Sequence, residues 1–438
     1  MEIESDDRFS TVQERETPRR RVGALALLLA FLLFVALGHS VTRLPSGGLR
    51  PASEPSSPAP NAVEPASPPR ADAPLRIDPV VLAAAVEVVE REVGRGAFPG
   101  AALAIGVGER VELLRGVGRI GWTSNASEVD PAETRYDLAS VTKAMATVPA
   151  VLLLVEEGRM GLDEPVARYL PVFSGGGKDA VTIRHLLTHT SGLPAGAILR
   201  GEARWQKIDR LLRRIPVNGA PGRRVEYSDV GYVILYEAAR RAAGEPLPNY
   251  LQRRLWEPLG MTSTGFSPGL DCEECAPTGR LRDGRLYRGR PFDETAQSLD
   301  GITGNAGVFS TARDVARFAA MIANGGELDG VRIFRPETVR EFARAQPGTG
   351  TRTLGWEIFC RGEPVPSNQR CDDPYAFGHT GWTGTSVWID PERGVWVVLL
   401  TNRTYETRAP SRIAEVRREL FDRAMGEAPE RGSSPRAR

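Results

Sequence analysis

Residues 136–157 read YDLASVTKAMATVPAVLLLVEE. The apolar run after Lys143 predicts a buried helix over residues 140–157, with Ser140 at its start. Side chains three positions apart share a helix face, so the Ser140 hydroxyl and the Lys143 amine are expected to be neighbours. Burial is expected to lower the pKa of Lys143 and suit it to act as a base. The segment offers a nucleophile, a base and unpaired N–H groups for an oxyanion, although a helix-capping serine beside an exposed lysine gives the same pattern.

Strand-like segments flank this region at both ends of the chain. An amphipathic helix is followed by residues 101–107 and 110–118, which are joined by Gly108-Glu109, a hairpin signal. Further strands are expected near the C-terminus at 353–359, 375–381, 385–391 and 394–402, before a last helix at 411–425. Helices are expected between these two groups of strands at 183–189, 204–214, 229–243, 247–256, 311–323 and 336–345. We predict an α+β fold, with one sheet assembled from both ends of the chain and the helical middle as a second lobe.

A second segment with reactive side chains is residues 225–232, VEYSDVGY, at the start of another apolar helix. Tyr227 can share a proton with Lys143 and Ser140. Asp229 can hold Lys143 in place, or it can simply cap the helix.

A third segment, residues 377–385, reads FGHTGWTGT. Glycines in a strand allow a ligand to approach the backbone closely. His379 and Thr380 can then bind a carboxylate or a carbonyl group. The alternative interpretation is a histidine that packs in the core at a glycine-rich turn.

The three motifs, in this order and at wide spacing, resemble the serine β-lactamase and penicillin-binding-protein superfamily. The similarity is greatest to the branch of class C β-lactamases, D-alanyl-D-alanine carboxypeptidases and family VIII esterases. It covers about residues 80–425 and includes the stretches at 181–194, 257–266, 304–326 and 378–391. The resemblance implies an α+β fold: a five-stranded antiparallel β-sheet flanked by helices, with a second all-helical lobe.

The resemblance also implies a role for each motif. Ser140 would be the acylated nucleophile, and Lys143 and Tyr227 the proton-handling pair. His379 and Thr380 would bind substrate, followed by Gly381, and the backbone N–H groups of Ser140 and Trp382 would form the oxyanion hole.

Asp229 departs from the family pattern, which has asparagine at this position. Asparagine can donate a hydrogen bond to a substrate amide carbonyl, whereas an ionised aspartate can only accept. Acyl-enzyme chemistry tolerates this change, but binding of a peptide-like amide is disfavoured. His379 replaces the more basic lysine of many relatives, which weakens the expectation of tight carboxylate binding.

The N-terminal region predicts a membrane anchor. An uncharged apolar run at 22–38 follows Arg19–Arg21, which favours a cytoplasmic segment at 1–21 and a transmembrane helix. A cleaved signal peptide or a buried core helix are the alternatives. A linker rich in proline, serine and alanine is expected at 39–75, the catalytic domain at 76–427 on the periplasmic side of the cytoplasmic membrane, and a disordered tail at 428–438.

Composition excludes some classes of function. Among 438 residues, 56 are Lys or Arg and 55 are Asp or Glu, and this balance argues against a nucleic-acid binder. We expect no cofactor and no metal, because His185 and His189 lack the carboxylate of an HExxH motif. In an oxidising compartment the four cysteines can close as two local disulfides, Cys272–Cys275 and Cys360–Cys371, and free thiols are the alternative.

The sequence therefore predicts a membrane-anchored serine hydrolase that acts through an acyl-enzyme. The substrate carbonyl would belong to an ester, a D-amino-acid peptide of the cell wall or a β-lactam. One rival hypothesis is a cell-wall binding protein on the same fold with little turnover. Another is an anchored interaction module, which the complete Ser-Lys-Tyr set disfavours. The sequence does not predict the oligomeric state.

Overall fold

The computed structural model describes residues 76–197, 199, 201, 203–361, 365–366, 369–406 and 412–425. The expected N-terminal segment, membrane anchor and linker, and the expected C-terminal tail, lie outside these described residues. Within the described ranges, no helix combines the length and apolar character needed to cross a membrane.

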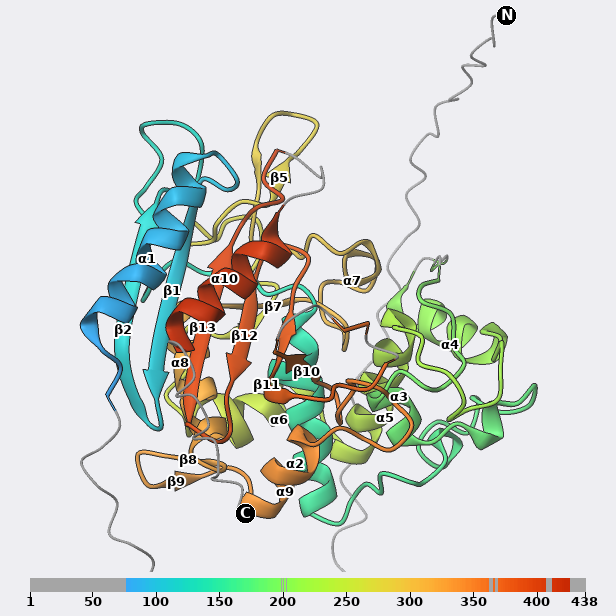
Figure 1. The fold of residues 1–438 in the computed structure, drawn as a ribbon. Coiled ribbons are helices and arrows are strands. Elements are labelled where there is room, and N and C mark those ends of the chain that lie inside the picture. The colour runs from blue at the N-terminus through green and yellow to red at the C-terminus, as the bar shows by residue number, and fades with distance from the viewer. Residues whose placement is uncertain are drawn as a thin grey trace, which may run out of the picture. The chain divides into compact units, whose positions relative to one another are not determined.

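The main sheet has six antiparallel strands in the order β10-β11-β12-β13-β1-β2 (Figure 1). These strands are β1 (Gly100–Val107), β2 (Arg110–Gly118), β10 (Glu357–Cys360), β11 (Pro374–Thr380), β12 (Ser386–Ile389) and β13 (Val395–Thr401). The prediction of one sheet from both chain ends is confirmed, because β1 pairs with β13 and Ala101 lies opposite Thr401. The resemblance implied five strands, and the structure corrects this number because the short strand β10 pairs with β11 at the sheet edge.

Helices cover both faces of this sheet. Side chains alternate along a strand, and Leu103 and Ile105 of β1 pack against α1 (Pro79–Gly94) and α10 (Ile413–Met425). Ala102 and Ala104 point to the opposite face, which α8 (Ala312–Ala323) covers. Figure 1 shows α1 and α10 side by side in front of the strands, with α8 behind them. Every residue of β1 is buried, as expected for an interior strand with helices on both sides.

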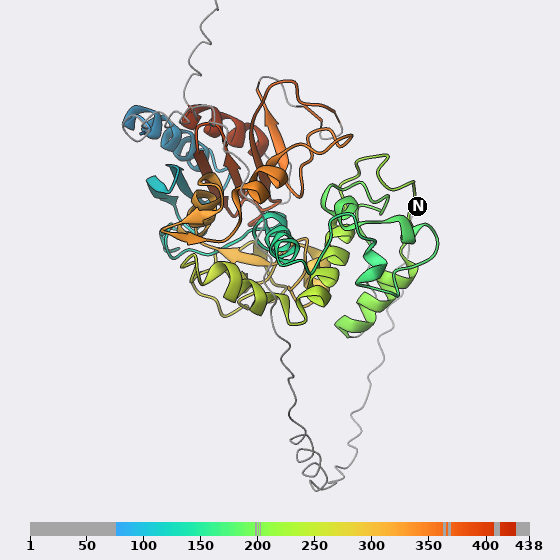
Figure 2. The same ribbon diagram turned by 90° about the horizontal axis from the view of Figure 1, so that it is seen from below.

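The remaining helices belong to the helical middle of the chain, but this middle is not wholly a separate lobe as predicted (Figures 1 and 2). The helix predicted at 311–323 is α8, whose apolar residues pack against the main sheet instead. The other helices are α2 (Val148–Glu156), α3 (Ile183–Leu187), α4 (Arg204–Arg214), α5 (Asp229–Ala243), α6 (Leu247–Leu251), α7 (Glu294–Ser298), α9 (Pro336–Ala343) and the short helices Val166–Arg168, Lys178–Ala180 and Gln252–Trp256. Short strands form a three-stranded sheet, β3 (Tyr136–Asp137), β7 (Val308–Ser310) and β4 (Gly265–Phe266), and two hairpins, β5 (Gly279–Arg280) with β6 (Leu286–Tyr287) and β8 (Glu327–Leu328) with β9 (Val331–Arg332). The observed architecture confirms the predicted α+β class.

The helix predicted over 140–157 is not continuous. A π-helical turn covers Lys143–Thr147, where the N–H of Val148 donates to the oxygen of Lys143, before α2 begins. Pro149 explains the difference, because its ring has no N–H and would collide with the carbonyl four residues earlier in a regular helix. The wider turn at Lys143–Thr147 removes this conflict. It lies close to Ser140, and such π-turns are frequent at functional sites.

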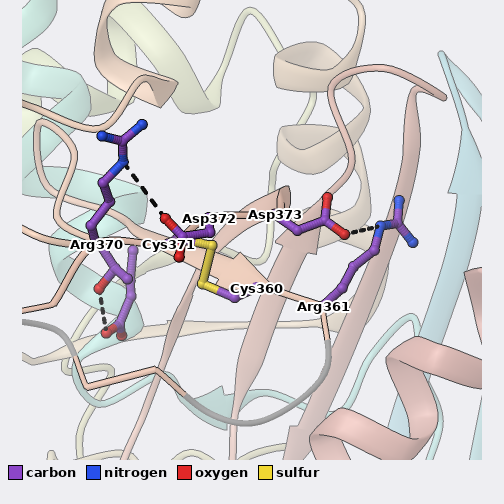
Figure 3. The surroundings of a disulfide bond; sticks show 8 residues. Cys360, Arg361, Arg370, Cys371, Asp372 and Asp373 are labelled. Carbon is purple, nitrogen blue, oxygen red and sulfur yellow. Dashed lines mark hydrogen bonds and ion pairs between the residues drawn. A yellow bond between two sulfur atoms is a disulfide. The ribbon is translucent and has the colours of Figure 1, made fainter.

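Both of the disulfides that the sequence left open are present. Cys272–Cys275 closes a short loop, and Cys360–Cys371 joins the end of β10 to the segment before β11. Figure 3 shows the second bond between two ion pairs, Arg361 with Asp373 at 3.6 Å and Arg370 with Asp372 at 3.9 Å. The covalent bond therefore ties together the edge hairpin whose second strand ends at Thr380.

Candidate active site

A strained turn presents Ser140. Ala139 has a φ of +47°, which side-chain-bearing residues rarely adopt. The buried carboxylate of Asp137 holds this conformation by accepting the N–H of Ala139 at 2.9 Å and that of Phe292 at 2.7 Å. Burial raises the pKa of Asp137 to about 7. Ser140 itself is half-buried.

Lys143 is the centre of the arrangement and has no exposed surface. Its ammonium donates to Ser140 Oγ at 3.1 Å, to Asp229 Oδ1 at 2.6 Å and to the backbone oxygen of Asn305 at 3.1 Å. An ammonium group has three donors and no acceptor. All three donors of Lys143 are thus used, and the predicted neighbourhood of Ser140 and Lys143 is observed.

The expected direction of the Lys143 pKa is wrong. Burial does lower it, but the electrostatic interactions and hydrogen bonds with Tyr227 and Asp229 raise it above the ordinary lysine value. Burial alone would lower the pKa of Lys143, and the partners that accompany burial reverse this direction. Lys143 is therefore an ammonium group at neutral pH and cannot accept a proton in this state.

Tyr227 and Asp229 reach Lys143 from the start of α5. The centroid of the Tyr227 ring lies 4.8 Å from Lys143 Nζ. Ser228 caps α5 by accepting the N–H of Gly231 at 2.9 Å, which leaves the Asp229 carboxylate for Lys143. Of the two roles considered for Asp229, the structure shows the one in which it holds Lys143.

The FGHTGWTGT segment joins the Ser140 turn at its backbone. Thr383 Oγ1 donates to the oxygen of Asp137 at 2.7 Å, and Thr385 Oγ1 donates to the oxygen of Leu138 at 2.8 Å. A Cβ atom at Gly381 would lie 2.4 Å from the oxygen of Leu138, so only glycine fits between the two segments. The structure thereby brings the third motif against the turn that carries Ser140, as predicted.

His379 is buried at 5% exposure and carries no charge. Burial, followed by the nearby cations of Lys143 and Arg352, lowers its pKa to about 3. Its Nδ1–H donates to the oxygen of Thr380 at 2.9 Å, while Nε2 is buried without a partner among the described residues. His379 therefore carries no positive charge with which to bind a substrate carboxylate. Thr380 is half-buried beside it at the end of β11.

Two contributors to the site were missed from the sequence. The oxygen of Asn305 accepts from Lys143, and the GNAGVFS stretch that contains it was a signal that only the family resemblance supplied. Arg352 is 7% exposed, and its guanidinium carbon lies 5.4 Å from the Tyr227 ring centroid. No motif surrounds Arg352, so the sequence held no signal for it.

The histidine pair at 185 and 189 has structural partners. His185 Nδ1 accepts the N–H of Thr182 at 3.2 Å in a helix-capping arrangement, and His189 Nδ1 accepts the N–H of Ser228 at 3.0 Å. The centroid of the His189 ring also lies 4.3 Å from that of the Tyr227 ring, so His189 packs against Tyr227. Among the described residues there is no group of three or more metal-ligating side chains.

The comparisons with known proteins define the class of protein. The family model described as Beta-lactamase matches residues 85–420, most of the chain, and the chain belongs to this family of serine hydrolases. A protein of Escherichia coli (strain K12) that is named as a D-alanyl-D-alanine carboxypeptidase is 33% identical over 303 residues, which cover 62% of this chain and 70% of that protein.

Solved structures share the fold. A penicillin-binding protein homologue from Caulobacter crescentus has a TM-score of 0.63 at 24% identity, and the match covers 80% of this chain and 98% of that one. A protein described as a β-lactamase/D-alanine carboxypeptidase from Pseudomonas syringae has a TM-score of 0.62 at 18% identity, with 80% and 99% covered.

Proposed function

We propose that the protein hydrolyses an acyl substrate through a covalent acyl-enzyme at Ser140. The observation that carries this proposal is the hydrogen-bonded Ser140–Lys143–Asp229 group, in which the lysine is fully buried and the serine is half-buried. Nucleophile and proton-handling group within hydrogen-bond reach are the geometric signature of covalent catalysis.

The proton of Ser140 needs an acceptor other than the Lys143 ammonium. The Tyr227 ring centroid lies 4.8 Å from Lys143 Nζ, so the Lys143 ammonium can stabilise a negative charge on the Tyr227 oxygen. In the proposed reaction the Tyr227 oxygen has given up its proton beforehand; Ser140 Oγ forms a bond to the substrate carbonyl carbon and passes its proton to this oxygen, while Lys143 stays an ammonium. Tyr227 then gives that proton to the leaving group as the scissile bond breaks, and water repeats the cycle on the acyl-enzyme.

The negative charge of each tetrahedral state requires fixed donors. The backbone N–H groups of Ser140 and Trp382 are the proposed pair. The hydrogen bonds from Thr383 and Thr385 support this assignment, because they fix the Trp382 turn to the residues directly before Ser140.

The substrate class is tested by turnover. Purified protein should be assayed with p-nitrophenyl esters, D-Ala-D-Ala peptides and nitrocefin. We expect the esters to be hydrolysed. The peptide is the second candidate substrate, because relatives of this chain are named as D-alanyl-D-alanine carboxypeptidases. Stable labelling by a penicillin without turnover of any of these compounds would favour the cell-wall binding protein.

Asp229→Asn is expected to increase the ratio of nitrocefin to p-nitrophenyl-acetate turnover about ten- to a hundredfold. A carboxylate cannot donate to the substrate amide oxygen, and the lost hydrogen bond and unpaired acceptor cost about 1–3 kcal/mol. Removing the Asp229 charge also lowers the pKa of Lys143. The activity of the variant towards both substrates should therefore begin at lower pH than that of the wild type.

The matched control is Asp209→Asn, because Asp209 pairs with Arg213 on the exposed side of α4. This variant should leave both the ratio and the pH profile unchanged. A ratio that stays flat in Asp229→Asn would remove the selectivity role and leave the Ser140 mechanism intact.

We further propose that residues 22–38 anchor the protein in the cytoplasmic membrane with the catalytic domain on the periplasmic side. Support comes from Arg19–Arg21 before the apolar run, since positive residues stay on the cytoplasmic side. A C-terminal reporter that works only in the periplasm is expected to be active, and to lose activity when residues 1–38 are deleted. Activity of a cytosol-only reporter in the full chain would reverse this topology.

A further inference from the structure

Arg417 on α10 contacts the turn of the third motif. Its Nη2 donates to the backbone oxygen of Gly381 at 2.6 Å and to that of Thr385 at 2.7 Å. The same turn is closed by the N–H of Gly381, which donates to the oxygen of Thr385 at 2.8 Å. One guanidinium group therefore holds both ends of the turn that contains Trp382.

The contact with Gly381 is made at a particular peptide bond. The C=O of Gly381 and the N–H of Trp382 belong to one planar unit and point in opposite directions. The Arg417 guanidinium therefore binds the oxygen of the same peptide unit whose N–H, on the opposite side, is the proposed oxyanion donor. Charge-assisted hydrogen bonds are strong, and hydrogen bonds in series polarise one another. Arg417 both fixes the plane of this peptide and strengthens its N–H as a donor.

Gly381 makes such a restraint necessary. A Cβ atom there would lie 2.2 Å from Thr385 Oγ1, so the position admits only glycine. Glycine restricts its own backbone less than any other residue, and rotation of the Gly381–Trp382 peptide would turn the N–H away from Ser140. The N–H of Gly384 donates to the oxygen of Gly381 at 3.0 Å and is a first restraint on this rotation. Arg417 adds a second, charged restraint on the same oxygen, since the Trp382 side chain is 59% exposed and contacts Arg403 at its ring.

The charge of Arg417 is not neutralised by an acid. In the described part of the chain its guanidinium pairs with no carboxylate, and Nε has no hydrogen-bond partner. Burial, and then the nearby cation of Arg403, lowers its pKa to about 9, which still leaves it charged at neutral pH. Arg417 is half-buried, and a partly desolvated cation without a counter-ion is costly. A developing oxyanion on the other side of the peptide would offset part of this cost.

We propose that Arg417 is a positioning residue that orients and polarises the Gly381–Trp382 peptide for oxyanion stabilisation. This inference rests on the proposed acyl-enzyme mechanism at Ser140. Acylation and deacylation both pass through an oxyanion, so the residue should affect both steps while leaving substrate binding almost unchanged.

The test compares Arg417→Met, Arg417→Lys and Arg417→Ala in the full chain with p-nitrophenyl acetate. Removing a direct oxyanion donor costs about 10²–10³ in kcat, so an indirect effect of about ten- to a hundredfold in kcat is expected for Arg417→Met, with little change in KM. Arg417→Lys keeps the charge and should recover part of kcat. Arg418→Met is the matched control, because Arg418 is the next residue of α10 and lies over the Phe359 ring, 4.9 Å from its centroid.

Chemical rescue separates this role from a structural one. Arg417 and Thr380 line a cavity of about 1130 Å³ between α10 and the β10–β12 edge, through which a small cation can reach the turn. Guanidinium at non-denaturing concentration should raise kcat of Arg417→Ala severalfold, while equal NaCl should not. Rescue should be absent in Arg418→Ala.

Three results would overturn the proposal. Unchanged kcat in Arg417→Met is the first. A loss of kcat that neither Arg417→Lys nor guanidinium restores, together with a lower unfolding temperature, is the second and indicates a merely structural contact. The third is a rise in KM confined to carboxylate-bearing esters, which would make Arg417 a substrate anchor. Failure of the acyl-enzyme mechanism is recognised separately, because the wild type would then not be labelled at Ser140 by a fluorophosphonate.

Discussion

Replacing Ser140 by alanine is expected to abolish covalent labelling by a serine-directed fluorophosphonate and to lower ester turnover by about four to six orders of magnitude. The hydroxyl is the only part of the arrangement that can bond to the carbonyl carbon in the proposed mechanism. The fold should persist, because the Ala139 turn is held by Asp137 and by the threonines of the third motif, none of which contacts Ser140 Oγ. Labelling is measured by gel fluorescence and the labelled residue by mass spectrometry.

Ser298→Ala is the control for this variant. Ser298 is also half-buried, and its hydroxyl donates to the oxygen of Thr295, far along the chain from the motifs. The control should be labelled like the wild type. Equal labelling of Ser140→Ala and the wild type would show that another residue is the nucleophile.

Replacing Lys143 by methionine is expected to reduce the rate of labelling and of ester turnover by about 10²–10⁴, the usual contribution of a positioned proton-transfer group. Methionine keeps the apolar length of the side chain in a fully buried position but cannot stabilise a negative charge on the Tyr227 oxygen or orient Ser140 Oγ. Stopped-flow fluorescence with an excess of reagent measures the rate of labelling directly.

Two comparisons isolate the proton-handling role. In Lys143→Met the Asp229 carboxylate loses its ion-pair partner, and the double variant Lys143→Met with Asp229→Asn removes this unpaired charge. The double variant should be labelled as slowly as Lys143→Met alone. Lys178→Met removes another buried lysine, whose ammonium donates to the oxygens of Leu212 and Arg213 away from the site. This control should unfold at lower temperature yet label at the normal rate; a wild-type rate in Lys143→Met would exclude the lysine from catalysis.

Local sequence patterns correctly predicted those helices and strands whose positions depend on residues close to one another in the sequence. Helix α5 begins and ends where the sequence predicts, because Ser228 caps its start and Gly244 adopts the left-handed conformation after its end. The strands of the main sheet were recognisable from β-branched and aromatic runs. The helical spacing of Ser140 and Lys143 predicted that they are neighbours, which their hydrogen bond confirms. The contact of Asp229 with Lys143 was one of two alternatives, and the structure shows it.

Features that depend on three-dimensional partners were not predictable in this way. The direction of the Lys143 pKa depends on Tyr227 and Asp229, which lie more than eighty residues further along the chain. Arg352 and Arg417 lie outside every motif and reach the site only through the packing of the C-terminal part of the chain. The π-turn after Ser140 depends on Pro149, because the proline ring interrupts the continuous helix that the apolar run alone predicts.

The pairing of β1 with β13 also determines when the domain can form. Strand β1 is apolar along its whole length and is among the first parts of the domain to be synthesised, whereas its partner is among the last. Contacts between residues so distant in the chain slow folding, and an unpaired strand edge is a template for aggregation. During synthesis, the edge of β1 that pairs with β13 therefore stays unpaired and prone to aggregation until Thr401 is made. A chain truncated before β13 should be degraded by proteases or bound by chaperones, even though it contains the whole Ser140 motif.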